Sequence, residues 1–429
     1  MIRFLFTGIL KDKSRSLLPI IIISIGVALT VLLHTWITGV IGESIELNAR
    51  FNTGHIKVMT RVHAEDADHA TNELALLGVD SLLNHLNNNY PQFEWVERIK
   101  LGGLIDFPDE TGETRAQGPV TGWAIDLLTA GSKEVARFNI EESLVQGQLP
   151  TKSGEALITN DFAESFDIQP GDEFTFFGST MDGSMAFENF IVTGTIRFGT
   201  TALDRGSIII DINDAQQALM MEDAASEILG FSKSGPYDND EATSVVTHYM
   251  QNANNDYPGF NEDEFAPVMS RLRDQSQMAE LMDYSGMISK TMIFIFVFAM
   301  SIVLWNSGLL GGLRRYSEFG LRLALGEDKK HIYTTLIYEA ILIGTIGSII
   351  GTSIGIGIAY YLQEVGIDVS GTMQNATMMM PSVIKASITP AAFYIGFVPG
   401  LFSMVLGNAL SGIGIYRRQT ANLFKELEV

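Results

Sequence analysis

The sequence of 429 residues contains no cysteine. Disulfide bonds, thiolate nucleophiles and Cys-ligated zinc are therefore excluded. Charge is also scarce, since charged residues make up 18% of the chain and hydrophobic residues 46%. Such a mixture arises when membrane segments dilute a soluble chain, so the distribution of these residues along the sequence carries more information than their mean.

Motifs of catalysis and nucleotide binding are missing as well. The sequence has no G-x-x-x-x-G-K-[ST] phosphate-binding loop and no HExxH metal motif, and segment 43–283 contains no G-x-S-x-G nucleophile elbow. His63 and His69 accompany two aspartates, but without a fixed metal-ligand spacing they favour a solvated loop. The acidic runs 238–241 and 262–264 lie among Asn, Gly and Pro and are expected to be loops. We therefore expect no catalytic, cofactor-binding or metal-binding residue in this chain.

Four long apolar runs predict four transmembrane helices, at residues 17–42, 287–312, 332–362 and 391–416. The first contains 25 consecutive residues without a formal charge. As a helix they reach ~37 Å, enough to cross a hydrocarbon core ~30 Å thick. A cleaved signal peptide is the alternative for this run, but its apolar stretch is longer than a signal core and no clear A-x-A site follows.

The placement of basic residues predicts the orientation of these helices. Segment 43–283 holds 41 acidic and 14 basic residues, a net charge of −27, whereas the rest of the chain holds 9 acidic and 14 basic residues. Most of the latter basic residues gather before the first run, between the second and third, and after the fourth: Arg3, Lys11, Lys13 and Arg15; Arg314, Arg315, Arg322, Lys329 and Lys330; Arg417, Arg418 and Lys425. By the positive-inside rule, 1–16, 313–331 and 417–429 are cytoplasmic, whereas 43–283 and the loop 363–390 lie outside.

Segment 43–283 has a mixed pattern that predicts a large α+β extracytoplasmic domain, inserted between the first and second helices of an otherwise all-α membrane protein. Helices are expected at 73–86, 215–221 and 241–252, and strands at 156–159, 173–177, 189–195 and 207–211. A β-rich part near 140–215 would then be flanked by helical stretches. The strong negative charge either attracts a basic partner or keeps the surface soluble, and we favour solubility.

The membrane runs are rich in glycine and poor in polar groups. Gly347, Gly351 and Gly355 recur at every fourth position, a spacing that lets helix backbones approach closely, either within the chain or across a dimer. Ordinary glycine enrichment in membrane helices is the alternative. Charged side chains occur only near the ends of the runs, as Lys290 and Glu339, and the other strongly polar side chains are few: His34, Asn306 and Asn408. The runs are therefore poor candidates for a hydrophilic channel, which needs ionisable groups facing a cavity.

The loop between the second and third runs predicts a short amphipathic helix at 313–326. Its charged row and its apolar stripe both have helical spacing and consist of Arg314, Glu318 and Arg322, and of Tyr316, Phe319 and Leu323, respectively. Gly326 is a typical C-terminal stop, and Asp328 can cap the next helix. An interfacial helix that lies on lipid is the alternative interpretation.

The same loop carries a resemblance to a known family. The pattern Arg315-x-x-Glu318-x-Gly320-x-Arg322-x-Ala324-x-Gly326, followed by Glu339, resembles the signature of the MacB/FtsX/lipoprotein-releasing (Lol-type) ABC transporter permease superfamily. Further segments of the chain resemble the same family in the same order: Gly54-His55-Ile56, Gly147-x-Leu149-Pro150, Gly154-Glu155-Ala156-Leu157-Ile158 and Pro170-Gly171-Asp172. The resemblance covers nearly the whole chain, and the order of the motifs makes it specific.

The resemblance implies a permease of the inner membrane that does no chemistry itself and binds no cofactor, because ATP is bound by a partner. The coupling helix that docks on that partner would comprise Arg314, Arg315, Glu318, Phe319, Gly320, Arg322, Leu323, Ala324 and Gly326. Since the phosphate-binding loop is missing here, the ABC ATPase is expected as a separate subunit in two copies. A second permease copy or a paralogue, membrane lipids and a periplasmic carrier or adaptor are the other implied partners, and nucleic acid is not.

The function implied is mechanotransmission, in which ATP-driven closure of the partner moves the outer domains through the membrane helices. Release of lipoproteins from the inner membrane is the favoured cargo process, because Gly54-His55-Ile56 resembles the lipoprotein-releasing branch. MacB-type efflux and FtsX-type control of a cell-wall hydrolase are the alternatives within the family. A membrane receptor or sensor is a remote alternative, since only about a dozen residues follow the last run.

Overall fold

The computed structural model describes residues 13–65, 72–109, 111–199, 201–257, 260–275, 278–368 and 383–417. The chain forms two compact units. The membrane unit comprises Met1–Gly42, Leu281–Ile367 and Val383–Val429, and the outer unit comprises Glu43–Glu280 and Asp368–Ser382.

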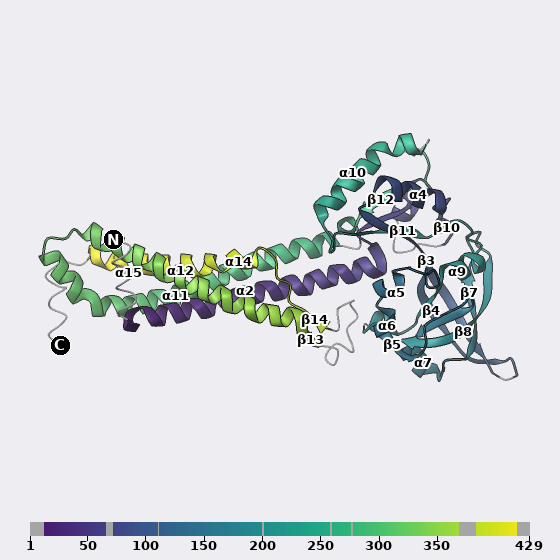
Figure 1. The fold of residues 1–429 in the computed structure, drawn as a ribbon, viewed down its shortest axis with the longest axis horizontal. Helices are drawn as coiled ribbons and strands as arrows, with labels where there is room; N and C mark the ends of the chain where they lie inside the picture. The colour runs from purple at the N-terminus through teal and green to yellow at the C-terminus, as the bar shows by residue number, and fades with distance from the viewer. Residues whose placement is uncertain are drawn as a thin grey trace. The chain divides into compact units, whose positions relative to one another are not determined.

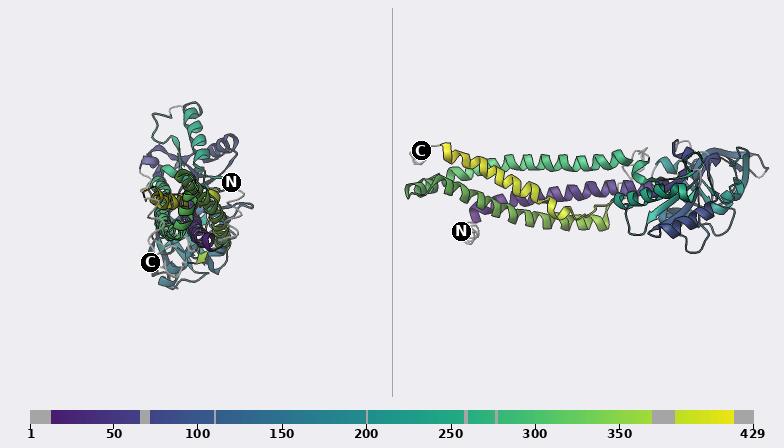
Figure 2. Two further views of the ribbon diagram at one scale, coloured as in Figure 1. Left: turned by 90° about the vertical axis from the view of Figure 1, so that its left-hand side faces the viewer. Right: turned by 90° about the horizontal axis from the view of Figure 1, so that it is seen from above.

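Long helices make up the membrane unit and run lengthwise together (Figures 1 and 2). They are α2 (Lys13–Asn48), α11 (Met278–Ala324), α12 (Lys329–Val365), the short α14 (Ala392–Ile395) and α15 (Phe397–Arg417); two short strands, β13 (Ile367–Asp368) and β14 (Val383–Ile384), pair with each other. Within the described residues, four helices are long and apolar enough to cross a membrane: Ser16–Thr53, Met278–Val303, Lys329–Val365 and Ala392–Leu410.

Apolar side chains fill the space between these helices and also cover their outer faces. Ile23, Val27 and Val31 of α2 are fully buried and belong to one cluster with Met300 of α11 and Ile343 of α12. Other large apolar side chains of the same helices are exposed, for example Ile25 and Phe298. A helix that is apolar on both its packed and its open faces is suited to a lipid environment.

The sequence predicted a separate short amphipathic helix at 313–326, and this prediction is wrong. Helix α11 continues through this segment without interruption, from Met278 to Ala324. This stretch contains no proline, so every backbone N–H is available to continue the helical hydrogen bonds.

The outer unit is built on a ten-stranded sheet with the order β12-β1-β11-β3-β4-β9-β6-β8-β5, and β7 bridges β3 and β8. The strands are β1 (Ile56–Thr60), β3 (Phe93–Pro108), β4 (Thr114–Ile125), β5 (Leu144–Gly147), β6 (Glu155–Thr159), β7 (Glu173–Ser179), β8 (Met185–Ile196), β9 (Ser207–Asp211), β11 (Glu227–Ser232) and β12 (Pro267–Arg271). A separate pair consists of β2 (Leu76–Leu77) and β10 (Ala224–Ala225).

Part of this sheet closes into a barrel. Strand β3 pairs with β4, β4 with β9, β9 with β6, β6 with β8, β8 with β7, and β7 again with β3. Closure is tight at Gly103 of β3, because a Cβ atom there would overlap the carbonyl oxygen of Phe177 in β7. Glycine is the residue that permits so close an approach of two backbones.

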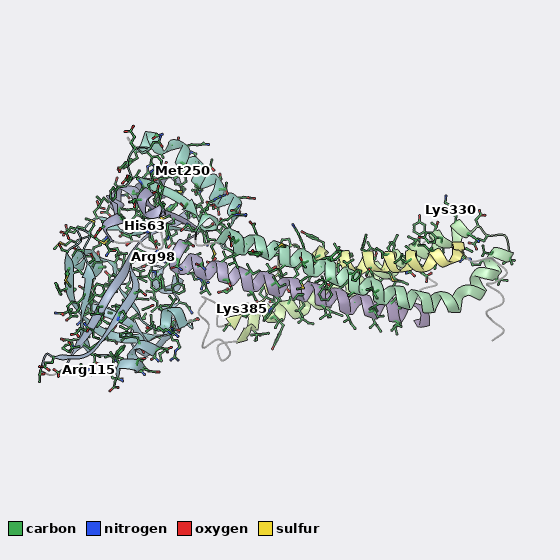
Figure 3. The ribbon with its side chains drawn as sticks, turned by 180° about the vertical axis from the view of Figure 1, so that it is seen from behind. His63, Arg98, Arg115, Met250, Lys330 and Lys385 are labelled. Carbon is green, nitrogen blue, oxygen red and sulfur yellow. The ribbon has the colours of Figure 1, made fainter. Side chains whose placement is uncertain are left out.

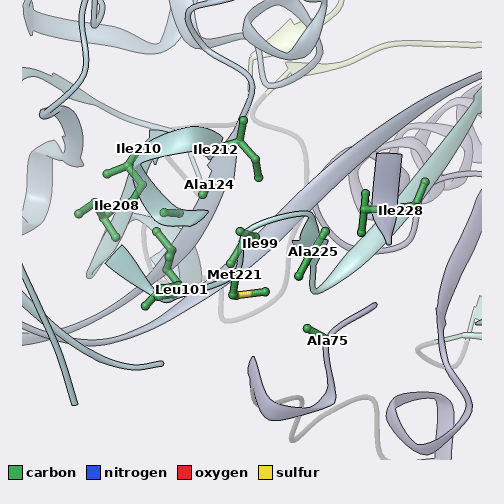
Figure 4. Close-up of a cluster of buried hydrophobic side chains, with 14 of the residues drawn as sticks. Ala75, Ile99, Leu101, Ala124, Ile208, Ile210, Ile212, Met221, Ala225 and Ile228 are labelled. Atoms are coloured by element: carbon green, nitrogen blue, oxygen red, sulfur yellow. The ribbon is translucent and has the colours of Figure 1, made fainter. Parts of the chain in front are cut away.

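Alternating side chains of β3 supply the core of the barrel. Ile99, Leu101, Ile105 and Phe107 are buried in one cluster. Figure 4 shows Ile99 and Leu101 of this cluster together with Ile208 of β9. The period of two is the signature of a strand with one face toward a core.

A smaller lobe extends from the barrel along β3. Residues Phe93–Arg98 of this strand pair with β11, and β11 and β12 flank β1. The chain enters this lobe at His55 and leaves it at Leu272, whose N–H donates to the His55 carbonyl oxygen at 3.0 Å. The entry and exit of the outer unit are therefore adjacent.

Short helices complete the outer unit. They are the π-helix η1 (Ala49–Thr53), α3 (Arg61–Glu65), η3 (Asn72–Leu74), α4 (Val79–Asn89), α5 (Glu134–Arg137), α6 (Ile140–Ser143), α7 (Asn160–Phe166), α8 (Thr201–Asp204), α9 (Ile212–Ala218), α10 (Asn239–Asp256) and η4 (Leu272–Asp274).

The outer unit is an α+β domain, as predicted, and the strands expected at 156–159, 173–177, 189–195 and 207–211 are present. The helix expected at 73–86 is wrong in its first half, where Gly78, at φ 68°, precedes α4 and Leu76–Leu77 form a strand. The helix expected at 215–221 begins and ends three residues earlier. The acidic run 238–241 is not a loop, because the Asp238 carboxylate caps α10 by accepting from the N–H groups of Asp240 and Glu241.

Candidate coupling and helix-packing sites

The predicted coupling segment ends in a glycine-terminated helix cap. The N–H of Glu327 donates to the Arg322 carbonyl at 3.0 Å, and the N–H of Gly326 donates to the Leu323 carbonyl at 3.1 Å. Gly326 has φ 91°, in the region that favours glycine. These paired bonds define a Schellman motif, which satisfies the last carbonyls of α11 and stops the helix.

Arg322 and Leu323 connect the end of α11 to the start of α12. The Arg322 guanidinium forms a two-pronged ion pair with Glu327, with Nε–Oε2 and Nη2–Oε1 distances of 2.6 Å, which lowers the pKa of that carboxyl. Leu323 packs against the fully buried Ile332 of α12. Asp328 precedes α12, but its side chain makes no capping hydrogen bond. The turn between the two helices is therefore fixed by Arg322, Leu323 and Gly326.

The remaining predicted coupling residues have a helical backbone. Ala324 is the last residue of α11, and the others lie earlier in the same helix: Arg314, Arg315, Glu318, Phe319 and Gly320. The side chains of 304–320 lie outside the described part of the structure, so the charged row from Arg314 to Arg322 stays a prediction.

The predicted helix-packing glycines of α12 face α2. A Cβ atom on Gly347 would lie 2.8 Å from Ile23 Cγ2, one on Gly351 2.5 Å from the Ser24 carbonyl oxygen, and one on Gly355 2.9 Å from Val31 Cβ. The Ser24 hydroxyl donates to the Gly347 carbonyl at 3.2 Å. This close approach is made within one chain.

Of the polar residues in the spans, His34 has no hydrogen-bond partner for either ring nitrogen among the described residues. Asn408 donates to the Met404 carbonyl of its own helix at 3.3 Å. The side chain of Asn306 lies outside the described part.

A buried polar group in the outer unit was missed by sequence reasoning. Lys57 Nζ lies 2.8 Å and Lys100 Nζ 3.2 Å from Glu227 Oε2, and Glu227 is fully buried. Burial alone would raise the pKa of Glu227, but Lys100 and Lys57 lower it to about 2. Burial also lowers the pKa of Lys57, to about 8. Nothing in the local sequence signals this group, because its members come from β1, β3 and β11.

His63 lies beside this group. The prediction that it belongs to a solvated loop is wrong. The side chain is 1% exposed in α3 (Figure 3), and burial lowers its pKa to about 4. His69 lies outside the described residues. Among the residues that the structure describes, no group of three or more His, Cys, Asp or Glu side chains is placed to hold a metal ion.

A second missed set surrounds the outer end of α2. Arg98 of β3 is fully buried and donates from Nε to Glu134 Oε2 at 2.7 Å and from Nη1 to the carbonyl oxygen of Arg50 in η1. The neighbouring Phe51 packs against the rings of Trp123, Phe138 and Phe198, at centroid distances of 5.6, 5.0 and 5.2 Å. These contacts join the end of the first long helix to the wall of the barrel.

Comparison with known proteins gives the class of this chain. Residues 16–250 match the family model of the MacB-like periplasmic core domain, and residues 290–420 match that of the FtsX-like permease C-terminal domain. The first match covers more than half of the chain and includes α2 and most of the outer unit, and the second covers the later helices of the membrane unit. The chain therefore belongs to the MacB/FtsX superfamily of ABC transporter permeases.

Individual relatives are more distant. A macrolide export ATP-binding/permease protein MacB of Hyphomonas neptunium (strain ATCC 15444) is 30% identical over 83 residues, which are 19% of this chain and 13% of that protein. The chain thus matches only a small part of this relative. The crystal structure of the periplasmic region of MacB from Actinobacillus actinomycetemcomitans is similar with a TM-score of 0.36 and 10% identity, over 54% of this chain and 95% of that chain.

Proposed function

We propose that this permease is the membrane subunit of a transporter that works by mechanotransmission. A separate ABC ATPase, in two copies, binds and hydrolyses ATP on the cytoplasmic side of the inner membrane, where both termini of the permease lie. Two permease chains, identical or paralogous, pass the closure of the ATPase to their outer domains. The chain itself binds no cofactor.

The observation that carries this proposal is the continuity of α11. This helix extends over 47 residues, from just after the last strand of the outer domain to the end of the predicted coupling segment. At 1.5 Å per residue it is about 70 Å long. A helix of this length without a break is suited to act as a lever, because a displacement at one end is delivered to the other. The low number of polar groups in the spans agrees with work done outside the membrane and without a hydrophilic path through it.

We propose that the work is release of lipoproteins from the membrane, with a periplasmic carrier or adaptor as the outer partner. The support for this cargo is the resemblance of Gly54-His55-Ile56 to the lipoprotein-releasing branch. Efflux of a small molecule is the second candidate, because the relative from Hyphomonas neptunium is named as a macrolide exporter.

The test is to reconstitute the permease with its partner ATPase in vesicles and to compare Glu318→Lys with the parent. Charge reversal in the coupling segment should leave ATPase activity in place and lower the ATP-dependent release of a triacylated lipoprotein roughly tenfold, as expected for a lost coupling free energy. Glu364→Lys is the control, since Glu364 is exposed at the opposite end of α12. Release at the parental rate in Glu318→Lys would contradict the coupling role, and ATP-dependent loss of a macrolide without lipoprotein release would favour efflux.

A further inference from the structure

Side chains of the outer domain contact the outer end of α2, and the proposed function assigns them no role. The helix runs to Asn48 and continues as the π-helix η1 to Thr53, and Gly54, at φ 57°, ends it. Within the next residues the chain enters β1. Contacts of Arg98, Phe51 and His55 hold this short stretch.

Arg98 holds the backbone of the helix end. Its guanidinium donates to the Arg50 carbonyl, which belongs to the last turn of the helix, where carbonyls have no partner within the helix. The same guanidinium is fixed by Glu134 and lies over the Phe138 ring, 4.5 Å from Cζ to the ring centroid. Arg137 also pairs with Glu134, so the carboxylate that orients Arg98 is itself held.

Phe51 holds the side of the helix end. It is 5% exposed, and its aromatic neighbours include Trp123 of the barrel strand β4 and Phe138, which follows α5. Ile209 of β9 and Leu157 of β6 lie in the same cluster. Phe51 therefore packs in a cluster to which several barrel strands contribute, so a displacement of the helix end is passed to that cluster.

His55 holds the helix end from the smaller lobe. The Ser232 N–H of β11 donates to His55 Nδ1 at 3.1 Å, and Nε2 lies 3.5 Å from Glu46 Oε2 of α2. The imidazole is 2% exposed. These two contacts of the His55 ring hold the angle between the end of α2 and the start of β1.

The position of Arg98 in the sheet makes it the pivot of this arrangement. Arg98 is opposite Glu227 of β11, whereas the next residue, Ile99, is opposite Ala124 of β4. Strand β3 therefore passes from the smaller lobe to the barrel at Arg98. The second long helix, α11, follows β12, which pairs with β1 of the smaller lobe. The two helices thus connect to different parts of the outer domain.

We propose that Arg98 and Phe51 are positioning residues that join α2 rigidly to the barrel, so that movements of α2 are delivered to the barrel and movements of α11 to the smaller lobe. The biological purpose of this joint rests on the proposed function. The experiment that tests the joint does not, because it measures the permease alone. A buried guanidinium suits such a joint because it binds a backbone carbonyl and a carboxylate at once in a fixed geometry. An ordinary core residue would contribute stability without orienting the helix.

The test measures the distance between α2 and the barrel with paired spin labels. The absence of cysteine allows labels at two introduced positions only, Leu29→Cys on α2 and Thr114→Cys on β4, both of which are exposed. Two single variants alter the joint. Arg98→Lys keeps the positive charge but loses the planar guanidinium that binds two acceptors at once, and Phe51→Leu keeps an apolar side chain but loses the ring. Arg197→Lys is the control, since Arg197 makes an exposed barrel ion pair with Asp161 at 2.8 Å.

We expect one narrow distance distribution in the parent and in Arg197→Lys, and loss of that narrow peak in Arg98→Lys and Phe51→Leu, at unchanged circular dichroism. A broad parental peak, or a narrow peak in both folded joint variants, would overturn the inference. If Arg98→Lys does not fold, Phe51→Leu decides, because leucine stays apolar in the same aromatic surroundings.

These measurements use the permease alone, without nucleotide, and so stand apart from the proposed function. A second label pair, Phe298→Cys on α11 with Thr114→Cys, is then followed in the complex with the ATPase and ATP. The distance from α11 to the barrel should change while that from α2 stays constant. A narrow α2 peak with no response of the α11 pair to ATP would contradict the proposed function and leave the joint intact.

Discussion

Glu227 shows how a single carboxylate holds two strands against β11. It is fully buried between Lys57 of β1 and Lys100 of β3, so it compensates the buried ammonium group of Lys57 and also pairs with the partly exposed one of Lys100. Removing one partner of a buried ion pair costs about 3–5 kcal/mol, because the remaining charge has lost its counter-charge but not its burial.

Glu227→Gln should therefore lower the thermal unfolding midpoint of the full chain in detergent strongly. Glu188→Gln is the matched control, because Glu188 of β8 is exposed. The measurement is near-ultraviolet circular dichroism against temperature. Equal midpoints for the two variants would show that the group is not a stabilising element.

Glu97 of β3 gives the outer domain a pH dependence of its own. Burial, followed by Asp80, Asp223 and Asp126, raises the pKa of Glu97 to about 7. In the unfolded chain the ordinary pKa of the group is 4.5. Between these values the folded protein keeps a proton that the unfolded chain releases, so the stability contribution of Glu97 falls as the pH rises from 4.5 to 7.

Glu97→Gln should abolish this contribution, because glutamine resembles the protonated carboxyl at every pH. We expect the variant to be more stable than the parent at pH 8 and nearly equal to it at pH 4.5, measured as urea midpoints at both values. A variant that loses stability at pH 8 would show that the ionised carboxylate has a stabilising partner.

At the residue scale, sequence reasoning found residues with local patterns and missed residues with distant partners. Gly326 ends α11 as expected, since a helix stop is a property of neighbouring residues. Arg98, in contrast, acts through Arg50 and Glu134, each more than thirty positions away. No spacing rule links such residues, because strand pairing and helix docking decide which of them meet.

At the element scale, the glycine row of α12 offers a direct comparison. Gly351→Ala places a Cβ atom 2.5 Å from the Ser24 carbonyl oxygen and 2.7 Å from Val27 Cβ of α2, whereas a Cβ atom on Gly357 meets nothing within 4 Å. Overpacking of this kind costs about 1–3 kcal/mol. The backbone of α2 cannot give way as a flexible side chain would.

Gly351→Ala should therefore lower the unfolding midpoint in detergent, and Gly357→Ala on the exposed face of the same helix should leave it unchanged or raise it slightly, since alanine favours helices. Thermal unfolding of both variants checks this. Equal behaviour of the two would mean that α2 and α12 do not depend on close backbone approach.

Elements were predictable where hydrophobic periodicity is local. The strands β6, β7, β8 and β9 follow this rule, and so do the long apolar helices. The longest strand, β3, was missed because charged residues and Gly102-Gly103 interrupt its pattern. Those glycines make sense only against β7, which lies some seventy positions later. The continuity of α11 was missed because the apolar run ends at residue 312, and a change from apolar to charged residues does not by itself end a helix.

At the scale of the whole molecule, the charge distribution predicts the topology. Single cysteines can test it, because the chain has none. In intact inner-membrane vesicles or spheroplasts, a membrane-impermeant maleimide should label Thr114→Cys only from the periplasmic side and Lys330→Cys only from the cytoplasmic side. Both positions are exposed. Labelling of Lys330→Cys from the periplasmic side would contradict the orientation and the coupling role of the 313–331 loop together.

The hydrogen bond between His55 and Leu272 brings the two ends of the outer domain side by side. A module whose termini meet can be exchanged for another of different shape without altering the spacing of the helices that carry it.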